Sequence, residues 1–302
     1  MALSLPMPDA TPTIRAFFDQ ATNTVSYLVA DLATGQAAVI DPVLDYCAAT
    51  GEVDTGAAEA ILAAAAEAGL AIQWVLETHI HADHLSGACI IAGRTGARVG
   101  IGAQVREVQR IFRPVFGAAD LVPDGRVFDH LFEDGEELGL GGLTIKVLHT
   151  PGHTPACVSY LIGDAVFVGD TLFMPDMGTA RADFPGGDAA TLFRSITRLL
   201  ALPPETRIFV CHDYLPEGRD KVVWETTVAA QHADNIHVRD GVSEAEFVAR
   251  RMARDATLQP PALLLPSIQV NMRAGRFPPA EADGVRYLRV PVRARGGDVA
   301  LP

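Results

Sequence analysis

The residues best suited to chemistry lie in one short segment of the chain. From Thr78 to Gly87 the sequence reads THIHADHLSG, so three imidazoles and one carboxylate occupy six consecutive positions. Neutral imidazole and carboxylate are ligands that suit zinc, iron or manganese. A lone histidine is more often a satisfied core or surface residue, but four ligand-type residues this close together predict a metal site.

Three later segments carry the same chemistry, and each follows a strand-like apolar run. They are HTPGHT from His149, GDTLF from Gly169 and CHDY from Cys211. Strand ends are where an α/β sheet gathers a site from distant parts of the sequence. The potential metal ligands are therefore His79, His81, Asp83, His84, His153, Asp170 and His212.

The elements that must position these ligands follow from hydrophobic patterning and helix propensity. Strands are predicted at 13–18, 24–30, 36–40, 72–76, 98–101, 144–148, 157–162, 165–168 and 207–210. Helices are predicted at 56–68, 84–93, 103–112, 189–200, 221–233 and 243–254. In this interpretation Asp83 and His84 enter the first turn of the helix at 84–93. Ser243 with Glu246 forms a capping box, and an extended tail follows Pro260-Pro261.

This order of strands and helices predicts an α/β fold, a four-layer αββα sandwich with a short C-terminal elaboration. The 302 residues are 49% apolar and 20% charged, which is enough to fill a sizeable core. The simplest organisation is a catalytic domain over residues 1–240. Residues 241–302 then form a helix and an extended tail packed on the same domain.

Composition also limits the partners. The formal net charge of −13 argues against general affinity for nucleic acid. The opening residues show no signal-peptide pattern and no apolar run reaches the length of a membrane span, so we expect a cytoplasmic protein with no membrane partner. Four scattered cysteines without a CxxC pair give little support for a disulfide framework. A homodimer is compatible with this organisation, although no interface stripe is visible.

The order HxHxDH, PGHT, GDTLF and a late histidine resembles the metallo-β-lactamase superfamily. That fold hosts both hydrolases and oxidoreductases, so membership leaves the reaction open. Seven ligands by themselves favour a dinuclear site, in which two metals generate a hydroxide nucleophile. An oxygenase would instead hold one iron through two histidines and a carboxylate.

Further segments are similar to the persulfide dioxygenases, the branch related to the mitochondrial sulfur dioxygenase and to glyoxalase II. They are DPVL from Asp41, RADF from Arg181, HDY from His212 and NMRAG from Asn271. The resemblance implies one Fe(II) per chain held by His79, His153 and Asp170. It places His81, Asp83, His84 and His212 around the iron, where they hydrogen-bond its ligands and water.

The resemblance also implies the substrates, glutathione persulfide and O2, with sulfite and glutathione as products. Because glutathione carries two carboxylates, the pocket should offer cations and polar donors. The candidates for substrate binding are Arg181, Tyr214 and Arg273. Arg181 could instead pair with Asp183 or Asp176, and Tyr214 could be a packing residue.

Two other functions stay open at this point. The first is a dinuclear thioester hydrolase like glyoxalase II, although that family typically has HEYT where this chain has HDY, and a longer helical C-terminal domain. The second is a thiol-binding or sensing module that uses the fold as a scaffold. The complete ligand set argues against the module, because a site that no longer binds metal has no physical need for all seven groups.

Overall fold

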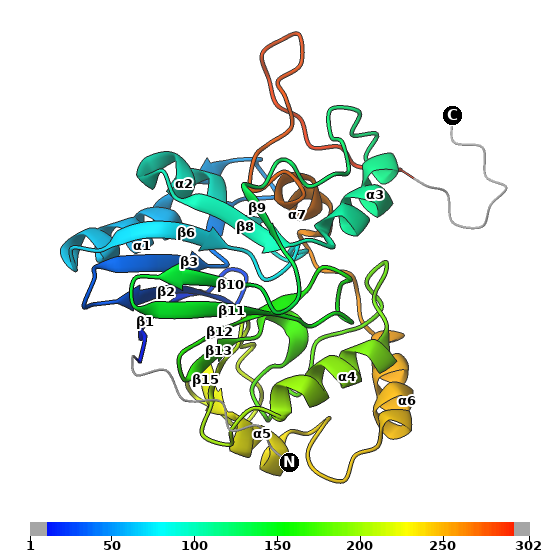
Figure 1. Ribbon diagram of the computed structural model, residues 1–302. Coiled ribbons are helices and arrows are strands. Elements are labelled where there is room, and N and C mark those ends of the chain that lie inside the picture. Colours follow the sequence, from blue (N-terminus) through cyan, green and yellow to red (C-terminus); the bar gives the residue numbers. More distant parts are fainter. Residues whose placement is uncertain (1–10, 293–302) are drawn as a thin grey trace, which may run out of the picture.

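The computed structural model describes residues 11–292, which form two packed sheets covered by helices (Figure 1). The first sheet has the order β1-β2-β3-β6-β8-β9, with bounds Thr13–Asp19, Thr24–Asp31, Gln36–Ile40, Ala71–Leu76, Arg98–Gly102 and His130–Phe132. The second has the order β10-β11-β12-β13-β14-β15, with bounds Glu137–Leu140, Leu143–His149, Val158–Ile162, Ala165–Phe167, Arg207–Phe209 and Glu225–Thr227. Both six-stranded sheets mix parallel and antiparallel pairs.

Strand alternation explains why the sheets face each other. In β2, Val25, Tyr27 and Val29 point into the apolar layer between the sheets, while Leu28 and Ala30 face the opposite side. Successive strand residues point to opposite faces, so one apolar strand fills two layers of the core. Every residue of β2 is buried, as expected for a strand covered on both faces.

Helices close both outer faces (Figure 1). The helices α1, α2 and α3 pack on the first sheet and span Gly56–Glu67, Ala88–Thr95 and Val105–Val115. The helices α4, α5 and α6 lie against the second sheet and span Ala189–Leu200, Val228–Asp234 and Glu244–Asp255. The predicted αββα sandwich is thus confirmed.

The structure corrects the predicted helix at 84–93. Residues 85 and 86 form a short strand β7, Leu85–Ser86, which pairs with β4, Val43–Tyr46, and α2 begins only at Ala88. A Cβ atom on Gly87 would lie 2.7 Å from the carbonyl oxygen of Val43, so only glycine fits between strand and helix. Asp83 and His84 therefore lie in an irregular loop.

Two other expectations about helices were wrong. The predicted helix at 221–233 begins at Val228, because Glu225–Thr227 is strand β15, paired with β14. The segment after Pro260-Pro261 is not a simple extended tail, since it contains helix α7, Leu264–Asn271. Pro266 sits in the first turn of α7, where a missing N–H costs nothing.

The capping box at the start of α6 is confirmed, with Ser243 and Glu246 bonded reciprocally. Helix α6 packs on α4, and α7 packs on β7. The end of the predicted C-terminal segment, residues 293–302, lies outside the described residues. A short strand β5, Val53–Asp54, completes the small sheet with β4 and β7. Within residues 11–292 the longest apolar helices fall short of what a membrane crossing needs.

Candidate metal centre

Ligand-type side chains from both sheets meet at one edge of the sandwich. The HxHxDH loop follows β6, and His153 lies in the turn between β11 and β12. Asp170 lies in a short 3-10 turn, Gly169–Thr171, after β13, and His212 follows β14. Each ligand leaves the end of a strand, so the order of strands sets their spacing.

One group of three matches the iron ligands that the resemblance implies. The ligand atoms of His79, His153 and Asp170 all lie within 4.8 Å of one another, and all three residues are buried. Asp170 Oδ2 lies 3.9 Å from His79 Nε2 and 3.6 Å from His153 Nε2. This spacing leaves room for one ion between them.

The remaining ligands gather on the other side of Asp170. His212 Nε2 lies 3.3 Å from Asp170 Oδ1 and 3.4 Å from Asp83 Oδ2. His84 Nδ1 lies 3.1 Å from the same oxygen of Asp83. Although burial opposes the shift, His212 and His84 lower the pKa of Asp83 well below its ordinary value, so this carboxylate is ionised.

Hydrogen bonds fix which nitrogen of each ring faces the centre. Thr78 donates its only hydroxyl proton to Asp41 Oδ2 at 2.8 Å, so its oxygen can only accept from His79 Nδ1 at 3.0 Å. His153 Nδ1 donates to the carbonyl oxygen of Arg181 at 2.8 Å. His212 Nδ1 donates to the carbonyl oxygen of Asn23 at 3.2 Å. The Nε2 atom of each ring therefore carries a lone pair directed to the centre.

Buried atoms without a hydrogen-bond partner also indicate a metal site. Buried polar atoms nearly always have a partner, yet several here have none within the described residues. They are His79 Nε2, His81 Nδ1, His84 Nε2, His212 Nε2 and Asp170 Oδ1. Cations bound at this centre would satisfy these atoms, so the donor set fits metal binding.

His79 and His81 differ in how firmly they hold a proton. Burial, followed by His81 and His153, lowers the pKa of His79 well below its ordinary value, which favours the neutral ligand form. Burial also acts on His81, but Asp41 and Glu77 outweigh it and raise the pKa of His81 well above its ordinary value. His81 Nε2 lies 2.9 Å from Asp41 Oδ1 and 3.5 Å from Glu77 Oε2.

Asn271 holds the ligand loop in place, a role the sequence interpretation missed. Its side-chain nitrogen donates to the carbonyl oxygens of His81 at 2.9 Å and His84 at 2.8 Å. Its side-chain oxygen accepts from Ser86 N at 2.8 Å. The signal was present in the NMRAG segment, but our attention went to Arg273 there. Glu77 was also missed, and nothing in its local sequence marked it.

A cavity of about 580 Å³ opens from the centre toward α6. Asp83, His153 and Asp170 line its metal end, and Arg181 and Tyr214 line it as well. Tyr214 stacks on His212 with ring centroids 5.5 Å apart, and 44% of its surface is exposed. Arg181 makes a two-pronged ion pair with Asp183 and donates to the carbonyl oxygen of Gln259.

The structure places Arg273 elsewhere, contrary to our expectation. Its guanidinium pairs with Asp120 at 2.8 and 2.9 Å and donates to the carbonyl oxygen of Gln269. It lines a separate cavity between the end of α3 and the segment after α7. Arg273 therefore ties α7 to the end of α3.

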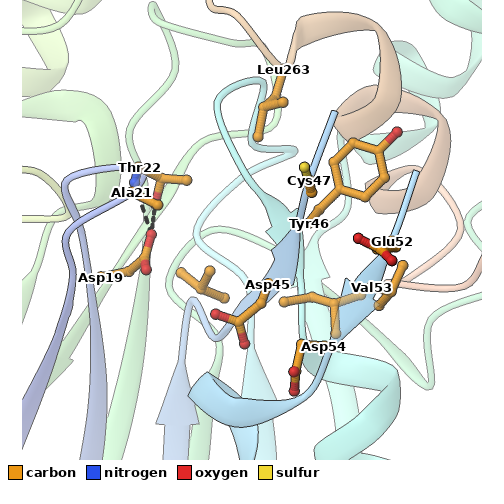
Figure 2. Close-up of a pocket in the computed structure, with 12 residues that line it drawn as sticks. Asp19, Ala21, Thr22, Asp45, Tyr46, Cys47, Glu52, Val53, Asp54 and Leu263 are labelled. Atoms are coloured by element: carbon orange, nitrogen blue, oxygen red, sulfur yellow. Dashed lines mark hydrogen bonds between the residues drawn. The ribbon is translucent and has the colours of Figure 1, made fainter. Parts of the chain in front are cut away.

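A neighbouring cavity of about 600 Å³ shares Ala21 and Thr22 with the metal pocket (Figure 2). Its lining is acidic and includes Asp19, Asp45, Glu52 and Asp54. Backbone N–H groups satisfy these carboxylates in several places, as where Asp45 accepts from Ala57 N at 2.8 Å at the start of α1. Figure 2 shows the exposed Cys47 next to Tyr46 among the lining residues. The lining of this cavity includes no histidine, lysine or arginine.

Comparisons with known proteins agree with this geometry. Residues 20–212 match the family model described as the metallo-beta-lactamase superfamily. A probable metallo-hydrolase of Burkholderia pseudomallei is 51% identical, over 93% of this chain and 99% of its own. Glyoxylase B2 of Dictyostelium discoideum is 46% identical, over 92% of this chain and 96% of its own.

Proteins with the ETHE1 name are more distant in sequence. The human mitochondrial persulfide dioxygenase ETHE1 is 29% identical, over 87% of this chain and 88% of its own. The crystal structure of ETHE1 from Myxococcus xanthus superposes with a TM-score of 0.70 and 32% identity, covering 87% of this chain and all of that one. The chain therefore belongs to the metallo-beta-lactamase superfamily, as an enzyme whose His/Asp site suits a metal cofactor.

Proposed function

We propose that this enzyme is an iron-dependent persulfide dioxygenase that acts on glutathione persulfide. One persulfide, one O2 and one water give one glutathione, one sulfite and two protons. The sulfane sulfur is oxidised, O2 is reduced, and the bond between the two sulfur atoms breaks. Fe(II), when bound, would supply the electron-transfer chemistry toward O2 that zinc lacks.

The observation that carries the proposal is the group of His79, His153 and Asp170. Two histidines and one carboxylate are the ligand set of non-haem iron oxygenases, which leave positions on the iron open for substrate and O2. Thr78 and the Arg181 carbonyl fix both imidazoles with Nε2 toward the centre. His81 lies beside this group, with its Nε2 atom 2.9 Å from Asp41 Oδ1.

The chain's own residues also shape access to this centre. The pocket is open to solvent on the side of Tyr214, while Phe173 and Ala82 add apolar surface beside the ligands. An apolar surround protects a persulfide from competing reactions in water. The similarity to human and Myxococcus ETHE1 supports the same assignment, since it covers 87% of the chain in both comparisons.

The test is oxygen uptake by protein loaded anaerobically with iron, after addition of glutathione persulfide. We expect uptake with one sulfite formed for each O2 consumed. A zinc-loaded sample is the matched control, and it should consume none. Bound iron without oxygen uptake would overturn the proposal.

A dinuclear hydrolase of glutathione thioesters is the second candidate, and one observation favours it. His84 Nε2 and His212 Nε2 lack partners within residues 11–292, just as His79 Nε2 does. These atoms, together with Asp83 and Asp170, would hold a second metal. Glyoxylase B2 and the Burkholderia metallo-hydrolase carry names that agree with hydrolysis. Two metals per chain and thioester cleavage without oxygen would establish this function instead.

A further inference from the structure

The wall of the metal pocket opposite the centre is built from α6 and the loop after it. Three arginines line the pocket: Arg181, Arg251 and Arg254. The carboxylates that line it, Asp83 and Asp170, both belong to the metal end. The pocket therefore has carboxylates at its metal end and arginines on the opposite wall, although the chain as a whole carries a net charge of −13.

Two of these arginines already have carboxylate partners. Arg181 is paired with Asp183 through both prongs of its guanidinium. Arg251 is buried and pairs with Asp255, with nitrogen-to-oxygen distances of 2.9 and 2.7 Å. A carboxylate ligand would have to compete with these existing pairs.

The pair of Arg251 and Asp255 also fixes α6 against the pocket loop. Arg251 donates to the carbonyl oxygen of Thr179 at 3.1 Å, and Asp255 accepts from Ala182 N at 2.9 Å. The segment between these contacts includes Arg181, whose carbonyl oxygen holds His153. Helix α6 is therefore rigidly placed relative to the metal ligands.

Arg254 differs from the other two arginines. It is exposed and, within residues 11–292, no carboxylate lies within ion-pair distance of its guanidinium. His237, on the same wall, adds no charge at neutral pH. Burial, followed by Arg251, Arg254 and Arg250, lowers its pKa to about 4. Arg254 is thus the cation on this wall that is available to a ligand.

We propose that Arg254 binds a carboxylate on the carrier of the substrate and so selects persulfides with an anionic tail. The inference rests on the proposed function and names the substrate end that lies away from the metal. Guanidinium binds carboxylate through two parallel hydrogen bonds, which also fixes the orientation of the tail. A phosphate-bearing carrier would present a similar anion, so the experiment includes both.

The experiment compares Arg254→Ala and Arg254→Lys with Arg250→Ala. Arg250 is equally an exposed arginine of α6, but it does not line the metal pocket, which makes it the matched control. For glutathione persulfide we expect Arg254→Ala to raise KM about tenfold with little change in kcat, because a charged hydrogen bond is lost. Arg254→Lys should recover part of the loss, and Arg250→Ala should resemble the unaltered enzyme.

Two further substrates identify the chemical group that Arg254 binds. With the uncharged 2-hydroxyethyl persulfide, Arg254→Ala should have no effect on KM. A larger KM increase for coenzyme A persulfide than for glutathione persulfide would assign Arg254 to phosphate and overturn the carboxylate assignment. Equal KM values for Arg254→Ala and the unaltered enzyme with glutathione persulfide would overturn the inference as a whole.

Calorimetric binding of glutathione itself separates this inference from the proposed function. Glutathione carries the same carboxylates but no sulfane sulfur, so its Kd reports on binding without turnover. A higher Kd in Arg254→Ala supports the inference even if no persulfide is turned over. An unchanged Kd, in an enzyme that does oxidise persulfides, leaves the dioxygenase standing and removes Arg254 from it.

Discussion

The two sides of the metal centre face different oxygens of Asp170, and they differ in how far their ligands are exposed to solvent. His79 and His153 face Asp170 Oδ2 and are fixed from behind by Thr78 and by the Arg181 carbonyl. On the other side His212 faces Asp170 Oδ1, and Asp83 is the most exposed of the ligands, with 20% of its side chain accessible. We refer to these groups as the inner side and the outer side.

The difference teaches what each function would demand. A one-iron oxygenase needs only the inner side, and the outer side then serves to bind water and position Asp170. A dinuclear hydrolase needs both sides equally, with Asp170 shared. Both sides offer ring nitrogens without partners among the described residues, so geometry alone keeps the hydrolase as a candidate.

Asp170→Asn should have the largest effect, because each oxygen of Asp170 faces one side of the centre. An amide is a poor ligand for iron, and loss of a ligand should lower metal affinity and activity by at least about 100-fold. Metal content after dialysis, measured beside kcat, checks this. The control is Asp188→Asn, which changes an exposed carboxylate that caps α4 and does not line the metal pocket. Unchanged iron content would remove Asp170 from the ligand set.

Substitution of one histidine on each side tests directly whether the inner and outer sides differ in metal binding. We expect His79→Ala to lose nearly all bound iron, and His84→Ala to keep about one iron per chain. The reason is that His84 is absent from the inner group of ligands. Metal analysis of both variants, loaded under the same conditions, is the measurement. If His84→Ala lost metal to the same extent as His79→Ala, the two sides would be equivalent and the hydrolase would be favoured.

Asn271→Ala should weaken both sides together, since Asn271 bonds to the backbone of His81, His84 and Ser86. The substitution leaves three buried backbone groups without their partner, which should cost about 3 kcal/mol of folding free energy. Thermal unfolding of the metal-free protein checks the loss. Gln73→Ala, at an exposed position of β6, is a suitable control. A Tm equal to that of the unaltered protein would show that the HxHxDH loop keeps its conformation without Asn271.

Much of the fold could be predicted from local signals. Helix α4 was predicted with its observed bounds, and its N-cap Asp188 accepts from Thr191 N. The start of α6 was readable from its capping box. The seven candidate ligands stood out because each belongs to a short local motif, and strand ends bring these motifs to one edge of the sandwich.

What the sequence hid depends on contacts between distant residues. The start of α2 is displaced by pairing of β7 with β4, about 40 positions earlier in the chain. Asn271 acts on a loop some 190 positions away, and no local pattern announces such a bond. The same holds for Arg254, whose place at the pocket no local pattern in the sequence indicates. Only the docking of α6 on the Thr179–Ala182 segment brings it to the pocket.

The smallest expected effect is on the pH dependence of stability, and it arises from His237 on the pocket wall. Removing the titration of His237 leaves the titrating groups on the two sides of the centre easier to compare. The pKa of His237 is about 4 in the folded chain, below its ordinary value of 6.5. Between these two values the unfolded chain binds a proton that the folded chain rejects, so stability falls as pH decreases from 6.5 to 4. Because His237 is partly exposed, solvent screening should limit the loss to roughly 1–2 kcal/mol.

His237→Asn keeps an acceptor for Thr179 N and removes the titration. Urea unfolding of the metal-free protein should therefore show a flatter pH dependence over this range in His237→Asn. Parallel curves for the two proteins would mean that His237 titrates normally, and that the fall in stability arises from the histidines of the centre.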